Sequence, residues 1–174
     1  MNHDPKRREA LAKMAARGGG GITVLHWAMG TKDAKYIDGC LQLLGGCHGG
    51  PDRKYKVLET KAVIADRKHP VAAGIDDFRV RDEFYYQLKF VKAEKDIQPL
   101  VRVTIDDQPQ TVAWCWERPD HGRSFGFSGL HFYDNWRLVE YRRLVAQGVL
   151  WTLKKPIPKE GLSVSVMEED LKLK

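Results

Sequence analysis

The chain has 174 residues, of which 43% are hydrophobic and 30% charged, and its 29 basic and 23 acidic residues give a formal net charge of +6. This length and balance fit one globular domain with a substantial core, and they exclude a disordered chain and a pair of full domains. No apolar stretch approaches the roughly 20 residues that a membrane-spanning helix needs, so we expect no transmembrane segment.

The distribution of charges and cysteines narrows the possible classes further. Basic and acidic residues are interleaved along most of the chain, and the dense basic cluster at residues 6–8 lies in a predicted helix, which favours a solvated helix face over a nucleic-acid-binding patch. The cysteines form no CxxC pair, which argues against a disulfide framework and a zinc ribbon and favours reduced, buried thiols. They are Cys40, Cys47 and Cys115. Residues 1–17 lack the apolar segment of a secretory signal, so we expect a cytoplasmic protein, unless a signal lies further upstream.

The N-terminal part of the chain predicts a helix, a strand and a second helix. Asp4-Pro5 is a helix-start signal, and good helix formers continue over 6–17 up to a stop at Gly18. The β-branched run at 22–25 is typical of a buried parallel strand, and His26 follows it directly. Apolar residues at three- and four-residue spacing over 33–44 indicate the next helix.

The middle and the end of the chain predict a loop, several strands and one long helix. Residues 45–51 contain four glycines and a proline, which predicts a loop without strand pairing. Residues 55–66 predict a strand, His69-Pro70 a turn, and β-branched or aromatic runs four more strands. These four are 84–90, 99–105, 111–116 and 124–127.

A final helix is predicted over 136–153, with Asp134 or Asn135 as its cap and Pro156 and Pro158 after its end. We therefore divide the chain into a domain of residues 1–158 and a polar C-terminal tail of residues 159–174.

Short motifs spread over most of the chain occur in the order and spacing of a single protein family. They are ITVL at 22–25 with His26-Trp27-Ala28, LLGGCHGG at 43–50, His69-Pro70 with Gly74, Phe78 with Asp82-Glu83-Phe84-Tyr85-Tyr86, Ala113-Trp114, Gly122-Arg123-Ser124-Phe125, His131 and Gly148-Val149-Leu150-Trp151. With these motifs the chain resembles ThuA-like (trehalose utilisation) domains from about Gly18 to Pro158. One departure is that many relatives have glycine before the late histidine, where this chain has Leu130.

The resemblance implies an α/β fold of the flavodoxin-like, class I glutamine amidotransferase type. Such a fold has a doubly wound, mainly parallel sheet with helices on both faces, here with some antiparallel strands. Ligands bind beyond the C-terminal ends of the parallel strands, so His26 and His131 should both reach the cleft. Because relatives usually have two or three βα units before the strand ending near Leu25, either the domain is N-terminally truncated or another subunit covers the open sheet edge, and we expect a homo-oligomer.

The resemblance also places chemistry on particular residues. In glutamine amidotransferases a cysteine nucleophile occupies the turn at or beside His26, and no cysteine of this chain lies there, so we do not expect glutamine hydrolysis. His26 is a candidate general base or metal ligand, or a residue that only packs at the strand end. His131 lies where the histidine of the amidotransferase triad would sit. Glu83 is favoured as the acid or ligand and Asp82 as a residue bonding local backbone, although the two could be reversed.

Two alternatives remain open for the chemistry of this set. His26, Glu83 and His131 could hold a divalent metal such as zinc or manganese, or could transfer protons without a metal, and sequence spacing does not separate the two. Apart from this metal, the sequence leaves the cofactor unknown. Further candidates for contacts to the substrate are Asp82, Tyr86, Trp114, Arg123 and Trp136.

The resemblance implies a carbohydrate-active enzyme, of the hydrolase, lyase or isomerase type, acting on a disaccharide or keto-sugar by His/Glu acid–base chemistry. The alternative is a non-catalytic carbohydrate- or protein-binding module of the same fold. A third option, nucleic-acid association through Lys6, Arg7 and Arg8, is not favoured. We expect a small carbohydrate as the ligand, and neither nucleic acid nor a membrane as a partner.

Overall fold

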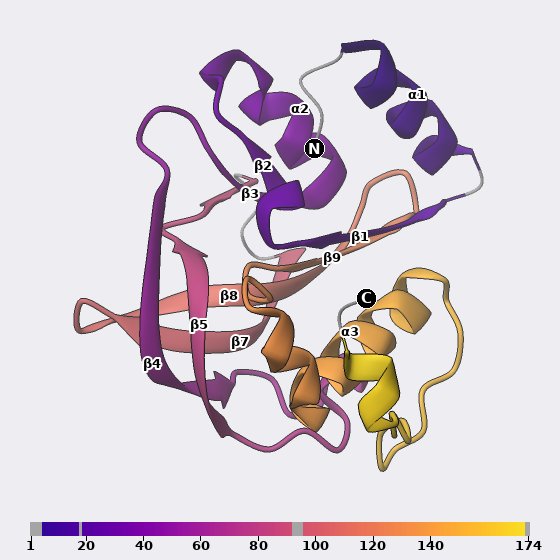
Figure 1. The fold of residues 1–174 in the computed structure, drawn as a ribbon. Coiled ribbons are helices and arrows are strands. Elements are labelled where there is room, and N and C mark those ends of the chain that lie inside the picture. Colours follow the sequence, from indigo (N-terminus) through magenta and orange to yellow (C-terminus); the bar gives the residue numbers. More distant parts are fainter. Residues whose placement is uncertain (1–4, 18, 92–95, 173–174) are drawn as a thin grey trace.

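The computed structural model describes residues 5–17, 19–91 and 96–172, which form a mixed α/β fold with two sheets (Figure 1). The larger sheet has six strands in the order β1-β9-β8-β7-β4-β5, and the smaller has three in the order β2-β3-β6. The helices and strands are α1 (Pro5–Ala16), β1 (Gly21–Leu25), β2 (Gly30–Thr31), α2 (Ile37–Leu44), β3 (Gly46–Gly49), β4 (Lys54–Ile64), β5 (Phe78–Tyr86), β6 (Lys89–Phe90), β7 (Ile97–Ile105), β8 (Gln108–Glu117), β9 (Arg123–Phe127) and α3 (Val139–Thr152). Short 3-10 helices span His26–Met29, Ala34–Tyr36, Pro70–Ala72, Tyr133–Arg137 and Glu168–Leu171.

The six-stranded sheet is mixed, which corrects the expectation of a doubly wound, mainly parallel sheet. Among the described residues, β1 and β9 form its one parallel pair, and the other neighbours run antiparallel. Asp106 and Asp107 join β7 to β8 with φ angles of 52° and 58°, as in a tight hairpin turn. Residues 118–122 join β8 to β9 in a similarly short link. Strands connected this closely must be antiparallel, because a parallel pair needs a crossover of a dozen or more residues.

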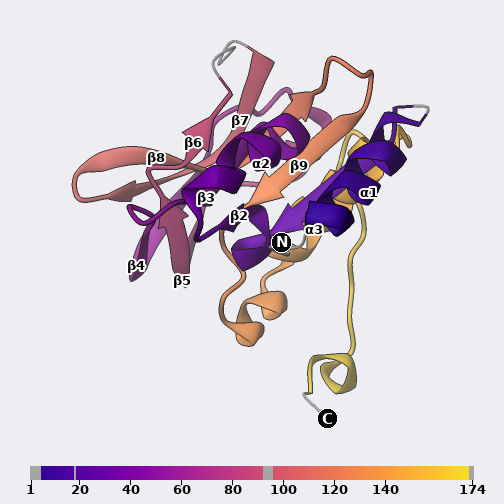
Figure 2. The same cartoon turned by 90° about the horizontal axis from the view of Figure 1, so that it is seen from above.

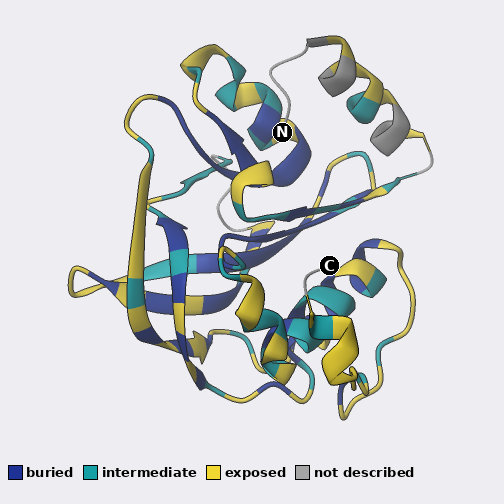
Figure 3. Ribbon diagram, viewed as in Figure 1, coloured by how far each residue is buried: buried dark blue, intermediate teal, exposed yellow. Residues whose placement is uncertain are grey.

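Two hydrophobic clusters lie on opposite faces of the β1–β9 part of the sheet. One packs α3 against β9, and the other packs α2 against β1 and the tryptophans of β8. Figure 1 shows the two helices on either side of this pair of strands, and Figure 3 shows buried residues concentrated there while much of β4 is exposed. The helices thus fix β1 and β9, the two strands that lead to His26 and to the segment with His131.

The segment predicted as a loop at 45–51 contains a strand, so that prediction was wrong. β3 pairs with β2 and β6, with Gly30 opposite His48 and Gly46 opposite Phe90. A Cβ atom on Gly46 would lie 2.6 Å from the Phe90 ring, and one on Gly30 would lie 1.9 Å from the carbonyl oxygen of His48. The glycines are therefore not strand breakers here, since their missing side chains let neighbouring backbone and rings approach closely.

Other element boundaries shift from the expected ones. The strand predicted at 84–90 is divided between β5, which begins at Phe78, and β6. The last helix begins only at Val139, after the 3-10 turn, and its N-cap residue is Leu138 rather than an acid or amide. The predicted cap Asp4 and stop Gly18 lie outside the described residues, as do the side chains of Arg7 and Arg8.

The C-terminal segment packs along α3 and the turn that precedes it. Arg142 donates to the Val164 carbonyl at 2.8 Å, and Arg137 pairs with Glu168 at 2.5 Å. Figure 2 shows this segment running along the outside of the molecule. Among the described helices, none combines the length and the apolar character that a bilayer-spanning segment requires.

Replacement of Trp114 by phenylalanine should destabilise the fold. Trp114 is fully buried, and its indole N–H donates to the Leu44 carbonyl at 2.9 Å, so Trp114→Phe leaves a cavity and an unpaired acceptor. We expect a loss of about 2–3 kcal/mol in the free energy of unfolding, measured by urea denaturation. The same substitution at Trp27, which is 52% exposed, is the control and should change stability by less than about 0.5 kcal/mol. Equal losses in the two variants would contradict the assigned packing of Trp114.

Candidate functional site

Three polar side chains from distant parts of the chain meet where the curled six-stranded sheet brings residues near its two outer strands, β1 and β5, close to each other. His26 follows β1, Glu83 lies in β5, and His131 lies in the segment after β9. His26 Nε2 lies 3.1 Å from His131 Nδ1, and Glu83 Oε1 lies 3.6 Å from the first and 3.5 Å from the second nitrogen. One nitrogen or oxygen atom from each residue falls within 4.8 Å of the others. We call these three residues the His/Glu cluster.

The parallel pairing of β1 and β9 positions His26 at the cluster. Leu25 pairs with Phe127, so the chain leaves both strands at the same level, with His26 beside Ser128. The imidazole Nδ1 of His26 lies 2.8 Å from the Ser128 carbonyl oxygen, which can only accept, so Nδ1 carries the proton. In the neutral ring Nε2 is then unprotonated and directed at the other two members of the cluster. The φ of 46° at His26 turns the chain sharply away from the strand.

His131 is positioned by the buried carboxylate of Asp82. Asp82 accepts hydrogen bonds from the backbone N–H groups of Leu130 at 2.6 Å, His131 at 3.1 Å and Phe132 at 3.4 Å. Leu130, at the position where many relatives have glycine, has a φ of 73°. This left-handed conformation costs a residue with a side chain about 1 kcal/mol or more, and the bonds to Asp82 offset that cost.

Tyr141 of α3 completes the environment of the Asp82 carboxylate. Its hydroxyl donates to Asp82 Oδ2 at 2.9 Å. Burial, followed by the neighbouring Asp82 charge, raises the pKa of Tyr141, so the hydroxyl remains a donor. Asp82 and Glu83 point to opposite sides of β5, as the alternation of a strand requires, and it is Glu83 that faces the histidines.

Aromatic rings lie next to the cluster, and among them His48 and Tyr55 were not selected by the sequence reasoning. The His48 and Tyr85 rings stack at 4.0 Å with an interplanar angle of 13°, and the Tyr85 ring lies 5.1 Å from that of His26. Tyr55, which is 55% exposed, contacts Tyr85 at 5.8 Å, and Trp27 is 52% exposed. His48 and Tyr85 belong to motifs that were recognised in the sequence, but nothing in the sequence pointed to their stacking.

The remaining candidates for substrate contacts lie in different places. Asp82 adjoins the cluster but is fully buried, and the Tyr86 hydroxyl lies 3.5 Å from Asp106 in the β7–β8 turn. Trp136 is partly buried in the 3-10 turn after His131. The structure does not bring Trp114 or Arg123 to the cluster. Trp114 is fully buried beneath α2, and Arg123 lies at the opposite end of β9.

His48 is a buried histidine that stays neutral. Its Nε2 lies 3.1 Å from the Trp27 carbonyl oxygen and so carries the proton, while Nδ1 has no hydrogen-bond partner among the described residues. Burial lowers the pKa of His48 from 6.5 to about 4, because protonation would place an unpaired charge inside the fold.

The protein should lose stability as the pH falls from 6.5 to about 4. In this window the unfolded chain binds a proton at His48 and the folded chain does not, so the free energy of unfolding falls by on the order of 3 kcal/mol. His48→Phe keeps a ring against Tyr85 and removes the titration, so its stability should depend less on pH. Urea denaturation across this window compares the slopes, and His69, whose pKa burial also lowers, contributes equally to both proteins. Identical slopes would contradict a neutral His48.

Solved structures with a similar fold include two ThuA-like proteins. One, from Bacteroides uniformis, has a TM-score of 0.68 and 16% identity over 88% of this chain and 66% of its own. The other, from Parabacteroides merdae, has a TM-score of 0.69 and 14% identity over 91% of this chain and 70% of its own. A cytoplasmic protein from Salmonella typhimurium follows with a TM-score of 0.56 and 16% identity, over 87% and 62%. This chain thus spans about two thirds of the length of these proteins.

Sequence comparison gives the family directly. None of the curated protein sequences matches this chain. The family model described as ThuA, trehalose utilisation, matches residues 2–152, which is most of the chain and includes every member of the His/Glu cluster. The chain therefore belongs to the ThuA (trehalose utilisation) family.

Proposed function

We propose that the protein is an enzyme that acts on a disaccharide or a keto-sugar through acid–base chemistry at the His/Glu cluster. The observation that carries this proposal is the convergence of His26, Glu83 and His131, whose polar atoms lie 3.1–3.6 Å apart although the residues come from three separate elements. Groups at this spacing can pass a proton between them or share it with a bound molecule.

The exposure of the three side chains indicates the direction from which a substrate would approach. The side chains of His26 and Glu83 are 16% and 12% exposed, whereas that of His131 is 43% exposed. A substrate would therefore meet His131 first. Glu83 or the free Nε2 of His26 would remove a proton next to a carbonyl group or activate a water molecule, and His131 would protonate the departing oxygen.

Two features support a sugar as the substrate class. The family is described by its role in trehalose utilisation. In addition, the exposed Tyr55 ring contacts Tyr85, whose ring lies 5.1 Å from that of His26, and the exposed Trp27 directly follows His26 in the chain. Such rings offer an apolar face with a polar edge. The C–H face of a pyranose could pack on a ring of this kind while its hydroxyl groups reach the histidines.

A metal-assisted form of the same chemistry is the second candidate. The distances within the cluster support it, because they match those between two ligands of one metal ion. Two ligands of a tetrahedral zinc ion, each about 2.0–2.1 Å from the metal, lie roughly 3.3 Å apart. The three separations in the cluster, 3.1, 3.5 and 3.6 Å, match this requirement. Two imidazoles and one carboxylate suit zinc or manganese and leave positions open for water or a sugar oxygen.

Glu83→Gln should abolish most of the activity while leaving the fold intact. The amide keeps the shape of the side chain but cannot accept a proton, so we expect turnover to fall by about 10²–10⁴-fold. Trehalose, sucrose and their 3-keto forms are the test substrates, with products followed by NMR. Glu59→Gln, at an exposed position of β4, is the matched control and should retain full activity.

The outcome that would contradict an enzymatic role is a wild-type protein that binds one of these sugars without converting it, with or without added metal. Such a result would favour the alternative of a carbohydrate-binding module. Unchanged turnover in Glu83→Gln would instead remove Glu83 from the chemistry.

Zinc or manganese should raise the melting temperature of the wild-type protein if the cluster holds a metal. A ligand at 100 times its dissociation constant stabilises the folded state by about 2.7 kcal/mol. His131→Ala should lose this shift, whereas His121→Gln, which removes an exposed imidazole elsewhere, should keep it. Equal shifts in both variants, or none in the wild type, would leave metal-free proton transfer as the mechanism.

A further inference from the structure

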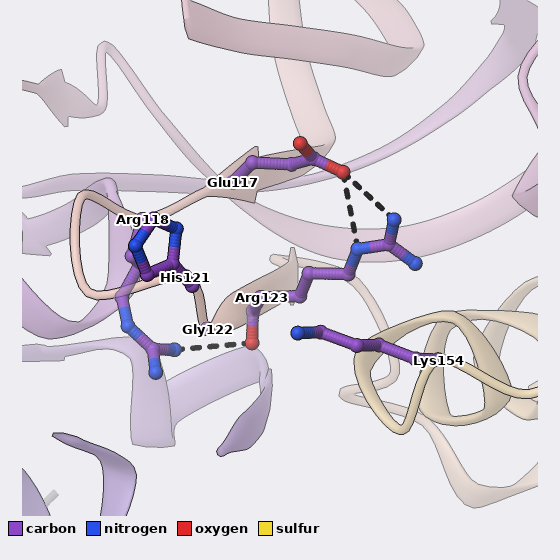
Figure 4. A pocket seen from close by; sticks show the side chains of 6 residues that line it. All are labelled: Glu117, Arg118, His121, Gly122, Arg123 and Lys154. Carbon is purple, nitrogen blue, oxygen red and sulfur yellow. Dashed lines mark hydrogen bonds and ion pairs between the residues drawn. The ribbon is translucent and has the colours of Figure 1, made fainter. Parts of the chain in front are cut away.

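Three hollows form a continuous groove at the end of the sheet opposite the His/Glu cluster. The first, of about 210 Å³, lies between the β8–β9 turn and the end of α3 (Figure 4). The second, of about 460 Å³, shares Arg123 and Lys154 with it, and the third, of about 270 Å³, shares Pro70 and Ile157 with the second. We call this surface the basic groove. Arg123 begins β9, whereas His131 lies beyond its other end, so the two sites are separate.

The residues that line the basic groove are strongly biased toward positive charge. Seven lysine and arginine residues line the three hollows, against one carboxylate, that of Glu117. Five of the seven lie outside the β8–β9 hairpin, and they are Arg67, Lys68, Lys154, Lys155 and Lys159. An excess of this kind along one surface raises the local concentration of anionic ligands.

Several of these charges already have partners within the protein. Arg118 bonds Asp120, and Arg123 pairs with Glu117 at 2.8 Å. Arg67 pairs with Asp77 at 2.6 Å.

The lysines of the groove differ from its arginines in this respect. Within the part of the chain that the structure describes, no ion pair is formed by these lysines, which are Lys68, Lys154, Lys155 and Lys159. Figure 4 shows the Lys154 side chain extending between Arg118 and Arg123 rather than toward a carboxylate. The groove therefore has several ammonium groups that are free to bind an anion.

The surface between the lysines is apolar. Pro70, Trp151, Pro156 and Ile157 line the second hollow, and the prolines keep the connecting loop from forming a regular element. Trp151 is only 5% exposed, and the Arg123 guanidinium lies over its ring at 4.7 Å. The Trp151 ring therefore offers no free face on which a nucleobase could stack. A suitable ligand would combine negative charges with aliphatic groups.

We propose that the basic groove binds an acidic peptide segment of another protein, in which carboxylate side chains are interleaved with aliphatic ones. The carboxylates pair with the lysines at the rim, and the aliphatic side chains cover the proline-rich floor. Nucleic acid would use the same ammonium groups but would gain nothing from the apolar floor, which is why the peptide is favoured.

The test uses a fluorescein-labelled peptide in which glutamate and leucine alternate, with binding to the full chain followed by fluorescence anisotropy. Lys154→Gln with Lys155→Gln should weaken binding by about 2- to 30-fold, since each exposed ion pair contributes about 0.2–1 kcal/mol. Lys32→Gln with Lys54→Gln removes the same charge from exposed positions elsewhere and should leave binding unchanged. A companion peptide with serine in place of leucine should bind at least about tenfold more weakly, because burying one leucine is worth that much.

Four results would overturn the proposal. These are the absence of binding by the wild-type protein at low salt, equal losses in the two double variants, equal affinity for the leucine and serine peptides, and tighter binding of a single-stranded oligonucleotide of the same net charge. The last result would assign the groove to nucleic acid. Melting curves of both double variants verify that the fold is retained, as expected for exposed lysines.

Discussion

The arrangement of the candidate site depends on one buried carboxylate. Asp82 is fully inaccessible to solvent, and it receives backbone N–H groups from three successive residues together with the Tyr141 hydroxyl. These bonds join β5 to α3 and to the segment that leads from β9 into α3, both of which are far from β5 in the sequence. An ionised carboxylate is tolerated in the interior only when its oxygen atoms are fully hydrogen-bonded, so this segment is held where the carboxylate requires it. The position of His131 beside Glu83 follows from that constraint.

Local patterns in the sequence predict several of the elements and part of the site. The β-branched run before His26 predicts a strand, and the structure has β1 there, with the histidine directly after it. The alternation of side chains along a strand correctly predicts that Asp82 and Glu83 point to opposite faces of β5. Both features are local, because they depend only on residues that are close in the sequence. In a strand, successive side chains point to opposite faces, so the sequence alone gives the direction of each side chain.

Features that depend on distant contacts could not be predicted from the same patterns. The sheet order and the strand at Gly46–Gly49 arise from which surfaces fit together, and a glycine-rich segment looks the same in a loop as in a tightly packed strand. His48 and Tyr85 stack because the fold brings one residue of β3 against one residue of β5, which belongs to the other sheet. The resemblance supplied the identities of His26, Glu83 and His131, and their mutual distances came only from the structure.

The bond from the His26 ring to the Ser128 carbonyl has a further consequence. The acceptor belongs to the residue just past the last pair of the β1–β9 ladder, and Ser128 is fully buried, with its own N–H donating to the Val112 carbonyl of β8 at 2.8 Å. The carbonyl group that fixes the imidazole tautomer is thus held in place by a third strand, β8. Moving the proton from Nδ1 to Nε2 of His26 would leave the Ser128 carbonyl without its donor, so the tautomer is tied to the pairing of three strands rather than to the rotation of one side chain.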